Sequence, residues 1–115
     1  MEHVKLKNLS AGKAVAALSG RLDVSVSGEV EEKLMDAIEK ENISHLILNM
    51  ENVEYMSSSG FRVAIALLRR LKDKNGSLKI CCVRPAVKRI FDVIELTSLF
   101  EIYNSEEEAV KTLPT

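Results

Sequence analysis

With 115 residues, of which 46% are hydrophobic and 29% charged, the chain has the size and composition of one globular domain and not of a disordered segment. Its formal net charge of −1 gives no electrostatic reason to expect nucleic acid or an anionic membrane as a partner. The sequence has neither a run of roughly 18 apolar residues nor the apolar core of a signal peptide, so we expect a cytoplasmic protein without membrane insertion.

The first third of the chain predicts a β-hairpin followed by a helix. Residues 4–9 alternate loosely between apolar and polar side chains, and residues 14–18 can return as a second strand. Gly20 is expected to end that strand, and Ser27 is a candidate N-cap of the helix. The apolar stripe of this helix ends near Lys40 and consists of Val30, Leu34, Ala37 and Ile38.

The stretch over residues 46–72 organises the rest of the chain. The short apolar run at residues 46–48 is typical of a strand that is covered on both faces, as in a parallel sheet. A polar connection leads to the triple serine at residues 57–59, which stands where a helix over residues 59–74 should begin. Small hydroxyl side chains at this place can bond free backbone N–H groups. The apolar face of the helix consists of Phe61, Ala64, Ile65, Leu67, Leu68 and Leu71.

The last third of the chain predicts two more strands and two more helices. Asn75-Gly76 should end the preceding helix in a left-handed conformation, and residues 78–83 form an apolar strand. Pro85 suits the first turn of a helix, and residues 100–103 suit a short final strand. Ser105, with a glutamate at position 108, matches the capping box of a last helix. The apolar stripe of the helix after Pro85 consists of Val87, Ile90, Phe91 and Ile94.

Strands that alternate with helices after an initial hairpin indicate an α/β fold. We expect a single domain over residues 1–115, with a mixed β-sheet of about five strands and about four helices. The strands that are joined through helices should be parallel, with right-handed crossovers.

Patterns typical of catalysis or metal binding are missing. A pair of a serine with His45 can be imagined in space, but no acid is marked to orient the ring. Metal-ligand spacings and phosphate-binding glycine motifs are absent, so we expect no metal and no cofactor. Cys81 and Cys82 are adjacent in a predicted strand, and their side chains should therefore point to opposite faces as two buried thiols. The pattern favours a binding protein over an enzyme.

The triple serine has two interpretations. In the first, the serines only cap the helix. In the second they belong to a small docking surface, because one cap needs one serine and because Val63 and Ala66 could be exposed next to Arg62. A buried edge or a neighbouring helix could instead cover Val63 and Ala66.

Residues 46–71 resemble the signature of the anti-sigma factor antagonists, the bacterial members of the STAS domain family. That signature is an apolar strand ending in Asp, a spacer, and then Asp-Ser-Ser/Thr/Ala-Gly before a helix. Here it reads LILN, MENVEYM and Ser57-Ser58-Ser59-Gly60. The segment Gly20-Arg21-Leu22-Asp23 resembles the family's Gly-x-x-Asp, and residues 87–100 resemble its third helix with the segment that follows. The resemblance thus extends over nearly the whole chain and implies a STAS-like fold.

The resemblance also implies a function. Position by position, it places a regulatory phosphorylation site at Ser58. The implied partner is an anti-sigma factor that is also a serine kinase: the unphosphorylated antagonist binds it and frees the sigma factor, the phosphorylated form lets go, and a serine phosphatase resets the protein. A monomer or weak dimer is expected. The docking surface would be formed or bordered by Asp23, Ser57, Ser58, Ser59, Gly60, Arg62, Val63 and Ala66.

Two residues depart from the family's pattern. The Asp before the phosphoacceptor is Ser57, and the Asp that ends the strand is Asn49, so negative charge is expected to be lost around the acceptor while Asp23 remains. If the kinase reads that charge, the acceptor could be Ser57 or Ser59 instead. The departures favour an alternative, a non-phosphorylated STAS scaffold subunit of a signalling assembly or transport system. A hydrolase with a serine nucleophile is the third possibility.

Overall fold

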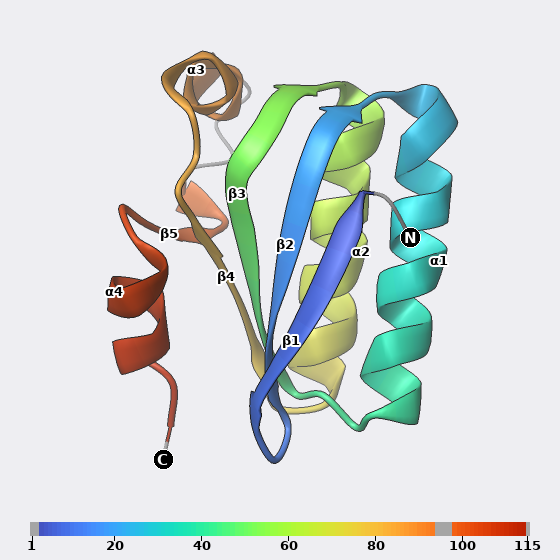
Figure 1. Cartoon of the computed structure of the whole chain (residues 1–115), viewed down its shortest axis with the longest axis vertical. Coiled ribbons are helices and arrows are strands. Elements are labelled where there is room, and N and C mark those ends of the chain that lie inside the picture. The colour runs from blue at the N-terminus through green and yellow to red at the C-terminus, as the bar shows by residue number, and fades with distance from the viewer. Residues whose placement is uncertain (1–2, 94–97, 115) are drawn as a thin grey trace.

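The computed structural model describes residues 3–93 and 98–114. It is built on a five-stranded sheet with the order β1-β2-β3-β4-β5, in which β1 runs antiparallel to β2 and the other neighbours are parallel (Figure 1). The predicted mixed α/β sheet with an N-terminal hairpin is confirmed. The elements in chain order are β1 (Val4–Ser10), β2 (Lys13–Leu22), α1 (Val24–Lys40), β3 (His45–Met56), α2 (Ser58–Asp73), β4 (Ser77–Cys81), α3 (Pro85–Val93), β5 (Glu101–Tyr103) and α4 (Glu106–Lys111).

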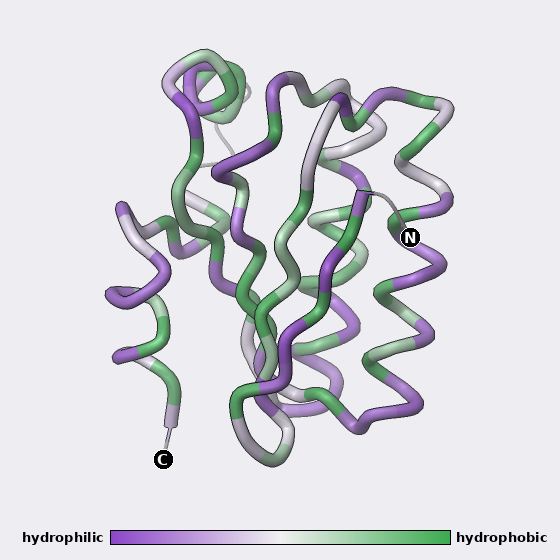
Figure 2. Tube along the Cα trace, viewed as in Figure 1, coloured by the Kyte–Doolittle hydropathy of each residue, from purple (hydrophilic) through white to green (hydrophobic). Residues whose placement is uncertain are grey.

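Helices cover both faces of the sheet. On one face α1 and α2 pack side by side and turn their hydrophobic residues toward the strands (Figures 1 and 2). Helix α3 joins this layer through Phe91, whose ring meets Phe61 of α2 edge-on with 4.6 Å between the ring centroids. Helix α4 lies on the other face, over a second buried cluster that contains Val15, Ile47, Cys81 and Ala109. Among the described residues, no helix has the length and apolar character needed to span a membrane.

The start of α1 differs from the prediction. Asp23, and not Ser27, is the N-cap: its Oδ1 accepts hydrogen bonds from the backbone N–H groups of Ser25 at 3.1 Å and Val26 at 3.2 Å. Ser27 is buried in the first turn, and its hydroxyl donates to the Asp23 carbonyl at 2.7 Å. Strand β2 also does not end at Gly20. The chain passes through Gly20 with φ +86° and continues as a strand to Leu22.

Strand β3 is much longer than the predicted one, because residues 49–56 are strand and not loop. In the pairing with β2, Ala17 lies opposite Asn49 and Ser19 lies opposite Asn52, so β3 contains one extra residue there. A second extra residue of β3 lies between Val53 and Tyr55. These two bulges turn the usual side-chain period of two into a period of three. Met50, Val53 and Met56 are accordingly the buried residues of this half of the strand.

The end of α2 is left-handed at Asn75, with φ 59°, and Gly76 is needed for a different reason. A Cβ on Gly76 would lie 1.5 Å from the carbonyl oxygen of Ser44. Gly76 therefore allows the helix end to touch the chain that leads into β3.

The C-terminal part follows the prediction with two corrections, of which the first is that β4 ends at Cys81 and does not extend to residue 83. Val87 and Phe91 of α3 are buried, whereas Ile94 lies outside the described residues. The Ser105 hydroxyl caps α4 by accepting from the N–H of Glu108 at 3.1 Å, as predicted. The two cysteines, however, do not point to opposite faces. Cys82 has φ +62°, which breaks the strand alternation, and its side chain packs against the same buried cluster that contains Cys81.

Candidate functional site

The carboxyl ends of β2 and β3 place the starts of α1 and α2 beside each other. Leu22 pairs with Met56 in the sheet, and the Leu22 carbonyl then accepts two hydrogen bonds from Ser57, one from its N–H at 3.0 Å and one from its Oγ at 3.1 Å. Asp23 and Ser58 follow directly after these tied residues. The sequence signals at positions 23 and 58 thus belong to one site, at the edge where parallel sheets usually bind ligands.

Ser57 occupies the N-cap position of α2 but does not cap the helix. Its hydroxyl accepts no capping hydrogen bond and donates to the Leu22 carbonyl, so the predicted serine cap is wrong. The Ser57 carbonyl accepts the N–H groups of Gly60 at 3.0 Å and Phe61 at 3.3 Å. The Ser58 side chain is exposed, whereas Ser57 and Ser59 are half-buried. Among the three serines, Ser58 therefore offers the most accessible hydroxyl.

Gly60 lets the first turn of α2 lie directly on the strand ends. A Cβ at this position would meet Met56 Cγ at 2.7 Å and the Leu22 carbonyl oxygen at 3.2 Å. Any larger residue would push the serines away from Leu22. Gly60 is itself buried, and it determines how closely the first turn of α2 lies against the strand ends.

The structure brings only part of the predicted docking residues to the surface. Arg62 is exposed, one turn after Ser58, and Ala66 is half-buried. Val63 is only 7% exposed, because it packs between α1 and α2 near Val30. Of the two interpretations of Val63, cover by a neighbouring helix is therefore correct.

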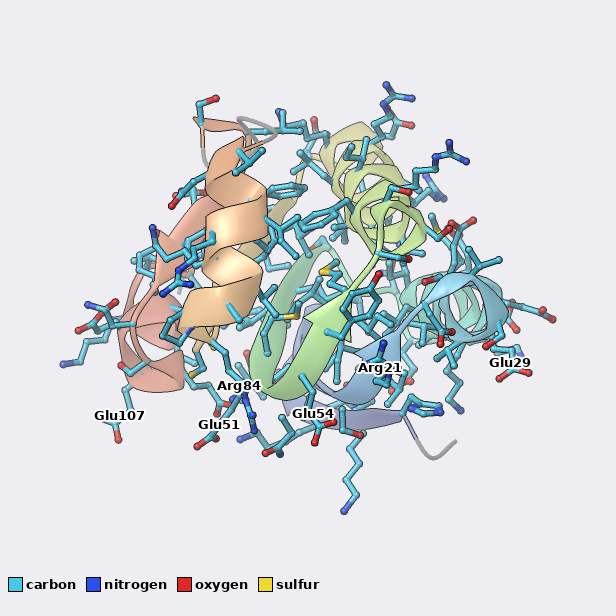
Figure 3. The ribbon with its side chains drawn as sticks, turned by 90° about the horizontal axis from the view of Figure 1, so that it is seen from above. Arg21, Glu29, Glu51, Glu54, Arg84 and Glu107 are labelled. Carbon is cyan, nitrogen blue, oxygen red and sulfur yellow. The ribbon has the colours of Figure 1, made fainter. Side chains whose placement is uncertain are left out.

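Two apolar residues at this edge were missed by the sequence analysis. Val24, the first residue of α1, is 77% exposed next to Asp23, and Tyr55 is 37% exposed near the end of β3. The guanidinium of Arg21 lies 4.4 Å from the centre of the Tyr55 ring (Figure 3). No sequence signal could single them out, because Val24 resembles the other valines of its segment and Tyr55 stood in a predicted loop.

Asp23 carries a negative charge at this edge. The hydroxyl of Ser25 donates to its carboxylate at 2.7 Å and is the main cause that lowers the pKa of Asp23. Burial opposes this effect, and the backbone N–H groups of Val26 and Ser25 and the positive charge of Arg21 lower the pKa further. Asp23 is therefore ionised at neutral pH.

The model of the STAS domain matches residues 8–109 of the chain. The chain belongs to the STAS domain family. An anti-sigma F factor antagonist of Paenibacillus polymyxa is 31% identical over 102 residues, which cover 89% of this chain and 87% of the relative. An anti-sigma-B factor antagonist of Staphylococcus epidermidis is 30% identical over 90 residues, covering 78% and 82% of the two chains. The solved structure of the anti-sigma factor antagonist SpoIIAA in its unphosphorylated form aligns with a TM-score of 0.81 at 25% identity, over 93% of this chain and 92% of that one.

In this STAS domain the Asn49 side chain binds to α4 and not to the serines. Its amide Nδ2 donates to Glu106 Oε1 at 3.0 Å, and its Oδ1 accepts the N–H of Glu51 at 2.9 Å. Along β3, roughly 20 Å of strand separate it from Met56. The expectation that Asn49 changes the charge around the phosphoacceptor is therefore wrong. An amide suits this place because it can donate to the Glu106 carboxylate, which a second carboxylate cannot do.

Replacing Asn49 by Asp should destabilise the STAS domain by about 1.5–3 kcal/mol at pH 7, because a hydrogen bond to a charged group is lost and two carboxylates face each other. In the wild type, the ion pair with Lys7 and the bond from Asn49 lower the pKa of Glu106, and their contribution is lost as the pH falls through that pKa. The difference in unfolding free energy between wild type and Asn49→Asp should hence shrink from pH 7 to pH 4 in urea titrations. Adding Glu106→Gln should restore part of the loss at pH 7; an unchanged loss would contradict the assignment.

A histidine–serine pair does exist in this STAS domain, but at the opposite end of the sheet. His45 Nδ1 lies 2.8 Å from Ser77 Oγ at the amino ends of β3 and β4. Burial and the positive charges of Lys13 and Lys79 lower the pKa of His45. The charged groups that act on the ring are thus lysines, whereas a hydrolytic triad needs a carboxylate there. The pair gives no support to a serine hydrolase.

Proposed function

We propose that this STAS domain is an anti-sigma factor antagonist that acts by partner switching. Its unphosphorylated form binds an anti-sigma factor, which is a serine kinase, and thereby frees a sigma factor for transcription. Phosphorylation of Ser58 releases the complex, and a serine phosphatase resets the protein. The observation that carries the proposal is the exposed Ser58 hydroxyl at an uncapped helix start in a family member whose relatives bear this name. We place the protein in the cytoplasm, as a binding module without catalytic activity.

The proposed docking surface consists of exposed or half-buried residues at the carboxyl ends of β2 and β3. Val24 and Tyr55 would supply apolar contact area, and Asp23 and Arg62 would supply charges around the Ser58 hydroxyl. Ser57 and Gly60 fix the position of the backbone under this surface. The buried Val63 side chain packs under the surface in the core. The surface comprises Asp23, Val24, Tyr55, Ser58, Ser59 and Arg62, with Ala66 at its border.

A phosphoryl group on Ser58 is compatible with the fold. It adds about −1.5 to −2 charges, which the positive end of the α2 dipole and its free N–H groups can accept. The phosphate would therefore weaken the complex and not the fold, because the partner's contact with a neutral hydroxyl becomes a contact with a dianion.

The test uses the anti-sigma kinases of the source organism, purified and mixed with this protein one by one. With ADP, one of them should form a complex that co-elutes in size-exclusion chromatography. With ATP, intact mass should show one added phosphate, peptide mapping should place it on Ser58, and the complex should dissociate. The proposal fails if none of the kinases binds in either nucleotide, and a phosphate on Ser57 or Ser59 would move the switch to that residue.

Replacing Val24 by Asp should weaken binding of the kinase about tenfold, because a buried valine contributes about 1.5 kcal/mol or more to an interface. The fold should tolerate the change, since an acid at the first turn of α1 is favourable. The dissociation constant, measured by calorimetry, gives the effect. Val93→Asp is the matched control, because Val93 is 80% exposed at the end of α3, outside the docking surface. Equal losses for the two variants would remove Val24 from the interface.

The second candidate function is a scaffold subunit of a larger assembly that is never phosphorylated. Only Ser57 now favours it, because Asn49 is explained by its bond to Glu106. Light scattering of the pure protein separates the two functions: a large self-assembly would support the scaffold, and a monomer or weak dimer would support the antagonist.

A further inference from the structure

The two cysteines at the end of β4 lie together in an unusual turn. Cys81 is fully buried, and Cys82 is half-buried directly after the strand. The N–H of Cys82 donates to the Tyr103 carbonyl at 3.1 Å, which holds the turn against β5. The left-handed φ of +62° at Cys82 is uncommon for a residue other than glycine, and it places the Cys82 side chain against the same buried cluster that contains Cys81. The result is a pair of neighbouring free thiols on one face of the sheet.

We propose that Cys81 and Cys82 form a binding site for a trivalent arsenical, to which α4 controls access. An arsenic(III) oxide of the type R–As=O reacts with two thiols to give two As–S bonds and one water molecule, and the thiol protons leave in that water. No atom changes its oxidation state in this reaction, so neither an oxidant nor a reductant is needed. The proposal does not depend on the function of Ser58.

A direct disulfide between the two cysteines is the less favourable product. The peptide bond between them is trans, so their Cα atoms lie 3.80 Å apart. Unstrained disulfides join Cα atoms that are about 4.4–6.8 Å apart. Inserting one arsenic atom lengthens the bridge and removes this mismatch. Burial, the neighbouring Cys82 thiol and the carboxylates of Glu106 and Glu51 raise the pKa of Cys81, which keeps it a thiol at neutral pH and slow toward alkylating reagents.

Helix α4 covers the thiols. Cys81 belongs to the buried cluster with Ala109, and Cys82 and Val110 pack against the same cluster. The helix is six residues long, and Glu106 fastens it to the sheet by a 2.8 Å ion pair with Lys7 and the bond from Asn49. Because Cys81 has no exposed surface, an arsenical can reach both thiols only when α4 lifts. A short helix with few anchors is the kind of element that opens locally.

The first experiment adds phenylarsine oxide to the full chain and records intact mass. The wild type should take up one arsenical that blocks both thiols, survives an excess of mercaptoethanol and is removed by ethanedithiol. Cys82→Ser, with its fold checked by circular dichroism, should retain no arsenical in mercaptoethanol. The proposal is overturned if the wild type retains none either, or if Cys82→Ser retains as much as the wild type.

The second experiment tests the control by α4 through two matched variants. Glu106→Ala removes the anchor to Lys7 and Asn49, whereas Glu107→Ala removes a neighbouring charge whose side chain points away from the sheet (Figure 3). Uptake of phenylarsine oxide should be about tenfold faster in Glu106→Ala, as expected for losing a hydrogen bond to a charged group, and unchanged in Glu107→Ala. Equal rates in both variants would overturn the control by α4.

Discussion

Replacing Ser58 by Glu should weaken binding of the anti-sigma kinase about a hundredfold, which corresponds to about 2.7 kcal/mol. The carboxylate would place a negative charge in a contact that fits a neutral hydroxyl, and desolvating an unpaired charge costs several kcal/mol. The free energy of unfolding should hardly change, because Ser58 is exposed and an acid at a helix N-terminus is favourable. Calorimetry with the ADP-bound kinase and urea unfolding measure the two quantities.

Ser58→Gln is the matched control, since glutamine has the shape of glutamate without its charge. It should bind clearly more tightly than Ser58→Glu, and Ser58→Ala should bind like the wild type but accept no phosphate. If the Gln and Glu variants are equally weak, size and not charge breaks the contact. If Ser58→Glu binds like the wild type, the STAS domain is a binding module without this switch.

Replacing Gly76 by Ala should lower the free energy of unfolding by about 3 kcal/mol or more, or prevent folding. The added Cβ would lie 1.5 Å from the carbonyl oxygen of Ser44 and 2.5 Å from its carbonyl carbon. These are backbone atoms, and the same oxygen accepts the N–H of Ser77 at 2.9 Å, so relief of the clash would break the junction of β3 and β4. Urea unfolding followed by circular dichroism measures the loss.

Gly28→Ala is the control for this prediction. Gly28 lies within α1, and an added Cβ would meet no atom within 4 Å. Alanine there should stabilise the protein by about 0.5–1 kcal/mol, because glycine is a poor helix former. The two substitutions should therefore have opposite signs. A Gly76→Ala variant within 1 kcal/mol of the wild type would show that the helix end can move away from Ser44.

The order and type of the elements follow from local patterns, which is why the fold class could be predicted. The second half of β3 could not, because its bulges depend on the register with β2 and leave a period of three in the sequence. Ser27 was mistaken for a cap because Asp23 and Ser27 are both good N-caps, and only the backbone shows which residue bonds the free N–H groups.

For the candidate site, the positions of Asp23 and Ser58 could be predicted because short motifs mark both strand ends. What surrounds them could not. The burial of Val63 depends on how α1 packs against α2, and the exposure of Val24 and Tyr55 depends on where the sheet ends. Asn49 shows the same limit, because its partner Glu106 is far away in sequence and only the tertiary fold brings the two together.

The double attachment of Ser57 to the Leu22 carbonyl has a consequence for signalling speed. The N–H and the hydroxyl of Ser57 both bond to the Leu22 carbonyl oxygen, so the first turn of α2 can move little relative to the sheet. A group added to Ser58 would then keep a fixed position relative to the sheet. If Ser58 is phosphorylated as proposed, the partner would sense a change in surface potential, and the rate of switching would be set by the kinase and the phosphatase, without a slow refolding step.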